Sequence, residues 1–256
     1  MTPFEKKRIF LRVAYDGTNY CGWQVQRNGI TVQEVLDREL SALLREEIRT
    51  IGASRTDSGV HARGNVAVFD TTARMPAERI VYAMNTHLPP DIRVQESRLV
   101  PAAFHPRYTA TVKTYEYKIL NRMLPDPTRR LDSLFCYYDL DAEKMREALP
   151  HITGIHDFRS FQASGANHPE RSTVREVYGA ELYEEDEMLH FRITGNGFLY
   201  NMVRILAGTL LEIGKGSLRP EDMPAILEAR SREAAGPTAP AHGLTLMEIR
   251  YPEWGF

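Results

Sequence analysis

The amino-acid sequence predicts an α+β fold built from two similar halves. Short runs rich in β-branched and aromatic residues alternate with longer runs whose apolar residues keep helical spacing. In order, these runs give β-α-β-β-α-β in the first half, and the same order recurs in the second half with one extra helix. We therefore expect two ferredoxin-like (βαββαβ) halves, residues 1–105 and 106–256, whose antiparallel sheets join around a central cleft.

The first half begins with a strand, Ile9 to Tyr15, followed by a capped helix. Thr31 begins this helix, because Glu34 completes a capping box and apolar residues keep helical spacing as far as Leu44. The remaining elements are two strands, a helix that begins at a proline, and a last strand: residues 48–53, 65–70, 76–87 and 92–99.

The segment Phe104-His-Pro-Arg107 marks the boundary between the halves. The second half is expected to contain four strands and three helices: strands 108–120, 174–184, 188–194 and 244–251, and helices 142–150, 197–208 and 221–230. The helix over 197–208 is apolar nearly all round, which predicts burial. In the polar loop 162–175, Arg171 and Arg175 are either solvated or candidates for contact with an RNA backbone.

Composition excludes several classes of protein. The chain of 256 residues has a formal net charge of −2, so an RNA substrate would need a local positive surface. Cys21 and Cys136 lie far apart without C-x-x-C spacing, which indicates neither a zinc site nor a disulfide framework. The first residues are polar and no apolar run approaches the roughly 20 residues of a membrane span. We expect a soluble cytoplasmic protein without a membrane partner.

A polar loop between strands 48–53 and 65–70 concentrates ionisable residues, among them Arg55, Asp57 and His61. Asp-Ser-Gly is ordinary turn chemistry, in which the carboxylate accepts a backbone N–H and the glycine takes a positive φ. The alternative is chemical: a neighbouring arginine keeps a carboxylate ionised, as an attacking carboxylate requires. Both interpretations remain open on the residues alone.

At this loop the chain resembles a known family. Arg55-Thr-Asp57-x-Gly59-Val-His61-Ala is similar to the catalytic motif of the tRNA pseudouridine synthase A family, in which the Asp is the nucleophile. Four more segments match family motifs in the expected order: Tyr15-Asp-Gly-x-x-Tyr-x-Gly-Trp-Gln24, Lys113-x-Tyr115-x-Tyr117, Phe198-Leu-x-x-Met-Val-Arg204 and Gly243-Leu244-x-Leu246. The departures are Asn65, where Gln is common, and Thr245, where an aromatic residue or Cys is common. They concern fine substrate contacts rather than the chemistry.

Arg204 and Tyr115 each allow a structural and a functional interpretation. A guanidinium on an apolar helix needs a partner, because an unpaired buried charge costs several kcal/mol. An acidic residue of its own half would make a structural ion pair, whereas the resemblance implies that Arg204 pairs with Asp57 across the halves. Tyr115 would be a core aromatic in the structural interpretation. The resemblance implies instead that it stacks on the target base, a contact worth roughly 1–3 kcal/mol.

The resemblance implies isomerisation of uridine to pseudouridine at positions 38 to 40 of the tRNA anticodon stem-loop, without cofactor or metal. Asp57 would attack the ribose C1′ or the base C6, and the sequence leaves this choice open. Arg55 would orient the RNA or hold the flipped base, and Arg204 would keep Asp57 ionised. Tyr115 is also a candidate for removing the C5 proton. The family implies a homodimer whose subunits share each tRNA.

Two other classes of protein remain as alternatives. A noncatalytic RNA-binding module would explain the aromatic residues and arginines, but it gives no reason for an aspartate paired with a buried arginine. A hydrolase of N-glycosides would need a second carboxylate as general acid, and nothing in the sequence marks one.

Overall fold

The computed structural model describes residues 6–165 and 172–256, so Arg171 lies outside the described residues. The chain divides into two compact units. Unit 1 comprises Met1–Thr111 with Leu246–Phe256, and unit 2 comprises Val112–Thr245. The C-terminal segment is therefore part of the first unit, whereas the sequence-based division assigns it to the second half.

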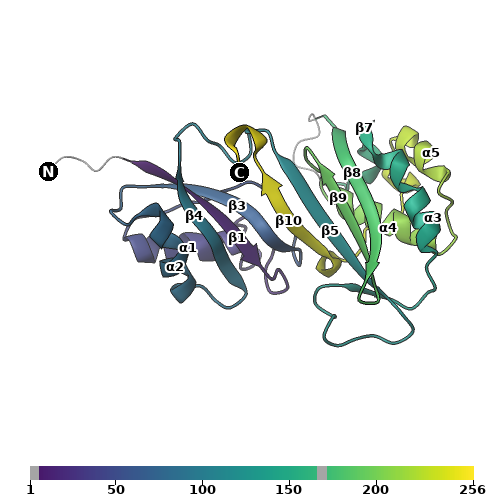
Figure 1. Cartoon of the computed structure of the whole chain (residues 1–256), viewed down its shortest axis with the longest axis horizontal. Coiled ribbons are helices and arrows are strands. Elements are labelled where there is room, and N and C mark those ends of the chain that lie inside the picture. The colour runs from purple at the N-terminus through teal and green to yellow at the C-terminus, as the bar shows by residue number, and fades with distance from the viewer. Residues whose placement is uncertain (1–5, 166–171) are drawn as a thin grey trace. The chain divides into compact units, whose positions relative to one another are not determined.

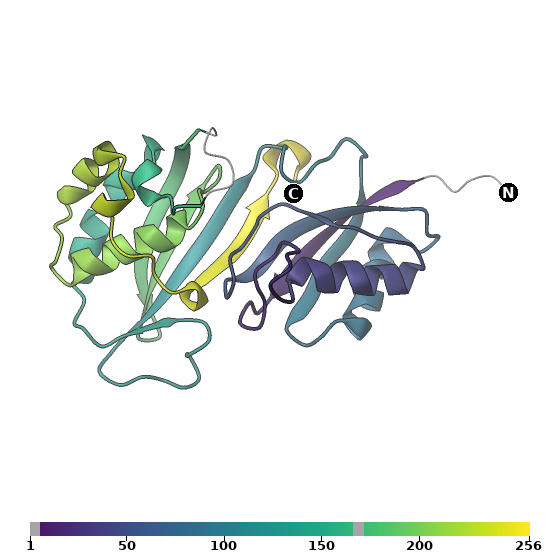
Figure 2. The same ribbon diagram turned by 180° about the vertical axis from the view of Figure 1, so that it is seen from behind.

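Unit 1 is an antiparallel sheet with two helices on one face (Figure 2). Its elements are β1 (Lys7–Tyr15), α1 (Val32–Leu44), β2 (Ile51–Gly52), β3 (His61–Thr71), α2 (Ala77–His87), β4 (Ile92–Val100) and, from the end of the chain, β10 (Leu244–Arg250). The strands follow the order β4-β1-β3-β10, and β2 pairs with β3. The elements before β10 occur in the predicted order β-α-β-β-α-β.

The first helix begins as predicted, but the second strand is shorter than predicted. Thr31 caps α1 by accepting a hydrogen bond from the backbone N–H of Glu34. The strand expected over 48–53 is reduced to β2 because side chains of α1 bind the backbone before it. Ser41 Oγ accepts from the N–H of Ile48 at 2.9 Å, and Asp37 Oδ1 accepts from the N–H of Thr50 at 2.8 Å.

The C-terminal segment packs on unit 1 through aromatic residues. The rings of Phe10 and Phe256 meet edge to face with their centroids 5.1 Å apart. Phe104 makes the same kind of contact with Tyr251, at 4.9 Å. The guanidinium of Arg98 lies 3.8 Å from the centroid of the Phe256 ring. These contacts bury apolar surface within unit 1, and they explain why the end of the chain belongs to that unit.

Unit 2 contains four antiparallel strands, with helices along one face (Figure 1). Its elements are β5 (Val112–Asn121), β6 (Leu134–Cys136), α3 (Ala142–Glu147), β7 (Gly154–Asp157), β8 (Val174–Glu185), β9 (Met188–Gly195), α4 (Met202–Gly214) and α5 (Asp222–Ala229). The order is β5-β9-β8-β7, and β6 runs parallel to β5. Strands β8 and β9 confirm the prediction closely, whereas β6 and β7 were not predicted.

The helix predicted over 197–208 begins and ends later, as α4. Asn201 precedes it with φ of +60°, a left-handed conformation that a continuing helix does not accommodate. The predicted burial is confirmed, since nearly every residue of α4 is buried. Among the described residues, no helix combines the length and the apolar character needed to cross a membrane.

Candidate active site

Asp57 lies in the loop between β2 and β3, at the first position of a tight turn. The N–H of Val60 donates to the carbonyl oxygen of Asp57 at 3.1 Å, and Gly59 has φ of +79°. The positive φ is the one expected of this glycine. Asp57 is half-buried, and Arg55 on the same loop is exposed. The turn therefore fixes the backbone that carries the Asp57 carboxylate, and the nearby Arg55 side chain is exposed to solvent.

The loop that follows β1 packs directly against this turn. The N–H of Trp23 donates to the carbonyl oxygen of Thr56 at 3.1 Å, and Ser58 Oγ donates to the carbonyl oxygen of Tyr20 at 3.2 Å. Gly22 has φ of +82°, and a Cβ there would lie 2.5 Å from the Thr56 carbonyl oxygen. Only glycine allows this approach, so the first motif supports the Asp57 turn.

His61, the first residue of β3, binds the backbone of the loop after β1. Its Nδ1 accepts a hydrogen bond from the N–H of Gly17 at 3.0 Å and lies 3.2 Å from Asp16 Oδ1. Asp16 Oδ1 accepts from the N–H and the hydroxyl of Thr18, at 3.0 and 2.6 Å. Partial burial works to raise the pKa of Asp16, but these hydrogen bonds and the nearby His61 hold it below its ordinary value. His61 is buried, so its role here is support of the loop.

Asn65, one of the two departures from the family motifs, is buried. Its side chain has an exposed fraction of 0%. Its amide is hydrogen-bonded to both the N–H and the carbonyl oxygen of Ser54, at 3.3 and 3.2 Å. The effect of this departure on substrate contacts stays a prediction. The partners of Asn65 lie at the start of the Asp57 loop.

In unit 2, Tyr115 on β5 is buried against Phe198. The exposed fraction of Tyr115 is 8%, and the two rings meet edge to face with centroids 5.3 Å apart and an interplanar angle of 85°. Phe198 precedes α4, whereas the sequence analysis placed it inside the helix expected over 197–208. The contact with Phe198 fixes the orientation of the Tyr115 ring.

Arg204 on α4 is half-buried and is held by two oxygen atoms of unit 2. Its Nε donates to the carbonyl oxygen of Ala239 at 2.8 Å, and its Nη1 donates to Asn201 Oδ1 at 2.9 Å. The N–H of Ala239 in turn donates to the carbonyl oxygen of Arg204 at 3.1 Å. These bonds fix the plane of the guanidinium and join it to the chain before β10.

That chain segment also packs against β5. Tyr117 Oη donates to the carbonyl oxygen of Pro240 at 2.9 Å. A Cβ at Gly243 would lie 2.6 Å from Cζ of the same ring, so the glycine is required for contact. Burial raises the pKa of Tyr117, an effect that the charge of Arg204 partly offsets. The C-terminal motif therefore lies beside Tyr117, the next residue along the same face of β5 from Tyr115.

The four predicted site residues belong to different units. Asp57 and Arg55 share the loop of unit 1, and Tyr115 and Arg204 belong to unit 2. The pairing of Arg204 with Asp57 stays a prediction. The sequence analysis named Phe198 and Asn65 but assigned neither a supporting role. Phe198 had a signal, since it begins the motif that ends at Arg204, but nothing in the sequence separates a buried Asn from an exposed one.

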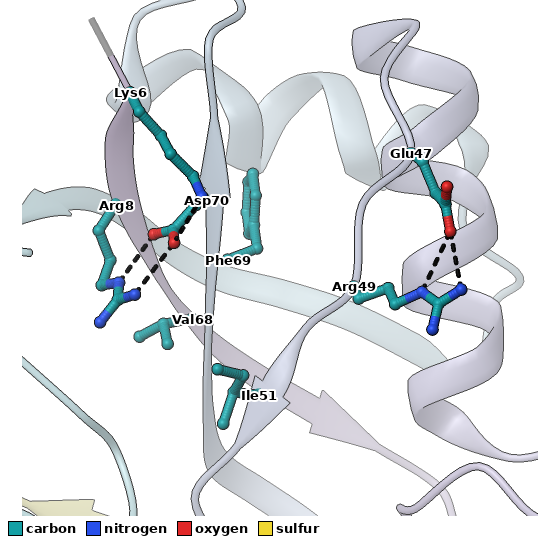
Figure 3. Close-up of a pocket in the computed structure, with 8 residues that line it drawn as sticks. All are labelled: Lys6, Arg8, Glu47, Arg49, Ile51, Val68, Phe69 and Asp70. Carbon is teal, nitrogen blue, oxygen red and sulfur yellow. Dashed lines mark hydrogen bonds and ion pairs between the residues drawn. The ribbon is translucent and has the colours of Figure 1, made fainter.

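A cavity of about 270 Å³ lies elsewhere on unit 1, and none of these four residues lines it (Figure 3). Its wall carries three cations, but Arg8 pairs with Asp70 at 2.8 Å and Arg49 pairs with Glu47 at 2.8 Å. With its arginines held by carboxylates, the cavity offers little charge to a ligand. Within residues 6–165 and 172–256, no three His, Cys, Asp or Glu side chains are grouped to hold a metal ion.

Comparison with known proteins gives one consistent result. The profile of a family described as tRNA pseudouridine synthase matches residues 12–109 and 148–252. A protein of Ruminiclostridium cellulolyticum named tRNA pseudouridine synthase A is 47% identical over 246 residues, which cover 96% of this chain and 100% of that protein. A protein of Moorella thermoacetica with the same name is 48% identical over 243 residues, covering 94% and 98% of the two chains.

Proposed function

The chain belongs to the tRNA pseudouridine synthase family and is an isomerase, and we propose that it converts uridine to pseudouridine at positions 38 to 40 of the tRNA anticodon stem-loop. In this proposal Asp57 is the nucleophile. The observation that carries it is the construction of the Asp57 turn, because hydrogen bonds join Thr56 and Ser58, on either side of a half-buried carboxylate, to the loop after β1. A nucleophile needs such a fixed position.

The reaction is an isomerisation without redox change. The bond between N1 of the base and C1′ of the ribose breaks, the base rotates, and a bond forms between C5 and C1′. The proton on C5 is lost, and N1 gains one, so atoms and charge balance. Asp57 attacks either C1′ or C6 to begin the sequence. In either route a general base must remove the C5 proton, and Tyr115 is our candidate.

The residues of unit 2 complete the proposed site. Tyr115, held by Phe198, stacks on the flipped base, which offsets part of the cost of unstacking it. Arg204, whose plane is fixed by Ala239 and Asn201, pairs with Asp57 and keeps it ionised. Arg55 contacts the RNA and holds the flipped conformation. The exposure of Arg55 on the Asp57 loop supports this role.

We further propose that the two units are ferredoxin-like and that their sheets join around a central catalytic cleft. In unit 1 the order β4-β1-β3, with β2 pairing to β3, supports the ferredoxin-like description. From the family resemblance, we also propose that the enzyme acts in the cytoplasm as a homodimer whose subunits share each tRNA. Sedimentation velocity, with and without tRNA, tests the dimer: a monomer at all concentrations would contradict it.

Five transcripts of one tRNA test the function. One carries uridine at positions 38, 39 and 40, three keep only one of these uridines each, and the fifth has cytidine at all three positions. Release of tritium from C5-labelled uridine should occur with each of the first four transcripts and stop when all three positions are cytidine. Release from the all-cytidine transcript would contradict the proposed position, and binding without release from any transcript would favour a noncatalytic RNA-binding module.

A further inference from the structure

A buried group of polar side chains lies beneath the Asp57 turn. Asn65 on β3, Tyr15 at the end of β1 and Thr56 beside Asp57 have exposed fractions of 0%, 5% and 7%. Asn65 Nδ2 donates to the hydroxyl oxygen of Tyr15 at 3.2 Å, and that hydroxyl is 2.7 Å from Thr56 Oγ1. These contacts connect the central strands of unit 1 with the residue that precedes the proposed nucleophile.

The amide of Asn65 uses both of its N–H groups and accepts two hydrogen bonds at its oxygen. The amide of Asn65 has two N–H groups, one directed at Tyr15 and the other at the carbonyl oxygen of Ser54 at 3.2 Å. Its oxygen accepts from the N–H groups of Ser54 and Val66, at 3.3 and 2.9 Å. Tyr15 Oη accepts from Asn65, and either hydroxyl can donate the bond between Tyr15 and Thr56. The network therefore connects Asn65 to Thr56 through Tyr15.

The network holds the loop at two points. Ser54 is bound through its backbone and Thr56 through its side chain, and these residues flank Arg55 immediately before Asp57. Apolar side chains could fill the same space without the cost of burying polar groups. Hydrogen bonds in a buried network do something that apolar contacts do not, since they fix one direction and one distance. The loop is thus placed as well as packed.

We propose that Asn65 and Tyr15 are positioning residues, which set the place of Asp57 through Ser54 and Thr56. This proposal rests on the proposed function, in which Asp57 is the nucleophile. Loss of this hydrogen-bond network should move the Asp57 carboxylate without removing any group that touches RNA. A displacement near 1 Å at a reacting group can lower a rate by about 100-fold. Variants that break the network should therefore slow the chemical step and leave tRNA affinity unchanged.

The test compares Tyr15→Phe, Thr56→Val, their double variant and Thr56→Ser. Phe and Val remove one hydroxyl each, whereas Ser restores the Thr56 hydroxyl. The matched control is Ser97→Ala, which removes a buried hydroxyl of unit 1 that donates to the carbonyl oxygen of Ala77 at 2.6 Å, away from the loop. For each variant we would measure single-turnover tritium release at saturating enzyme, tRNA binding and thermal unfolding.

Tyr15→Phe and Thr56→Val should each slow release about 10- to 100-fold with tRNA affinity within twofold of wild type. The double variant should be no slower than the slower single variant, because both lose the same bond, and Thr56→Ser should stay within threefold of wild type. Ser97→Ala should lose stability and keep the rate. Rates within twofold of wild type for both hydroxyl deletions, or equal slowing by Ser97→Ala, would overturn the proposal.

A second readout is independent of activity. Amide hydrogen exchange in a peptide covering residues 53 to 61 should become faster in Tyr15→Phe and Thr56→Val, and stay unchanged in Ser97→Ala. Unchanged exchange in the first two variants would overturn the positioning role. A wild type that releases no tritium would instead contradict the proposed function. Amide hydrogen exchange alone would then test whether the network positions the loop.

Discussion

The backbone N–H of Trp23 donates a hydrogen bond to the carbonyl oxygen of Thr56 at 3.1 Å, so the loop after β1 and the turn of the proposed nucleophile form one structural unit. The neighbouring Gly22 makes this approach possible, because its φ is +82° and it has no Cβ to meet Thr56. Residues that are separated in sequence thereby determine where Asp57 lies.

Gly22→Ala should disrupt this contact. The new Cβ would lie 2.5 Å from the Thr56 carbonyl oxygen and the residue would keep an unfavourable φ, so we expect both lower stability and tritium release slowed at least 10-fold. Gly216→Ala is the control, since Gly216 has φ of +79° with no atom within 4 Å of its Cβ position. It should cost about 1 kcal/mol in unfolding free energy and keep the rate. Equal rates in the two variants would contradict the argument.

Arg204→Lys should slow catalysis while keeping a positive charge. A single ammonium cannot reproduce the planar fork that reaches both Ala239 and Asn201, so we expect release about 100-fold slower and a moderate loss of stability. Arg232→Lys is the matched control, because Arg232 Nη1 donates to the carbonyl oxygen of Gly236 at 2.9 Å. That variant should lose similar stability and keep its rate, and a normal rate in Arg204→Lys would count against the role of Arg204.

Tyr115→Leu and Tyr115→Phe separate stacking from proton removal. Leucine removes the ring, so we expect tRNA binding to weaken by roughly 1–3 kcal/mol, measured by filter binding. Phenylalanine keeps the ring and its contact with Phe198 but lacks the hydroxyl. Its affinity should match wild type while release falls by about 100-fold or more, the usual range for a lost general base. Unchanged affinity in Tyr115→Leu would exclude stacking.

Glu116→Gln tests the electrostatics of unit 2 through pH. Glu116 is 3% exposed, and it accepts hydrogen bonds from Tyr183 and Arg192, each at 2.8 Å. Burial alone would raise its pKa, but His190, Tyr183 and Arg192 together lower it to about 2. The folded pKa lies below the unfolded value, so the carboxylate stabilises the fold above about pH 4.5 and loses this effect as the pH falls toward 2.

In urea unfolding, the difference between wild type and Glu116→Gln should therefore shrink on acidification. We expect about 3 kcal/mol at pH 7 and about 1 kcal/mol at pH 3, from the shift in pKa alone. A difference that is equal at both pH values would show that the variant acts through packing or hydrogen bonding rather than through the carboxylate's ionisation.

The fold could be predicted wherever local patterns decided it. Thr31 and Glu34 announced the first helix, and the acidic turn between β8 and β9 separated two strands of clear alternation. The misses came from contacts that join distant residues. Strand β2 is short because Asp37 of α1 binds the backbone of Thr50, and α4 begins late because Asn201 takes a left-handed conformation. Neither feature has a periodic signal.

For the site, the family was confirmed by the comparisons, and its motifs led to Asp57 and Arg204. The support around them was less visible. Asn65 was read as a departure near the substrate, whereas its burial and its bonds to Ser54 place it under the loop. A residue's burial depends on which strands lie beside it, and one sequence without the fold does not contain that information.

The most direct test of the central claim is tritium release from C5-labelled uridine in a tRNA anticodon arm by Asp57→Asn. This variant keeps the size of the side chain and removes its charge and nucleophilicity. We predict tRNA binding close to wild type, an unchanged unfolding temperature within a few degrees, and no detectable release under conditions in which the wild type completes the reaction. Release by Asp57→Asn within tenfold of the wild-type rate would contradict Asp57 as the nucleophile.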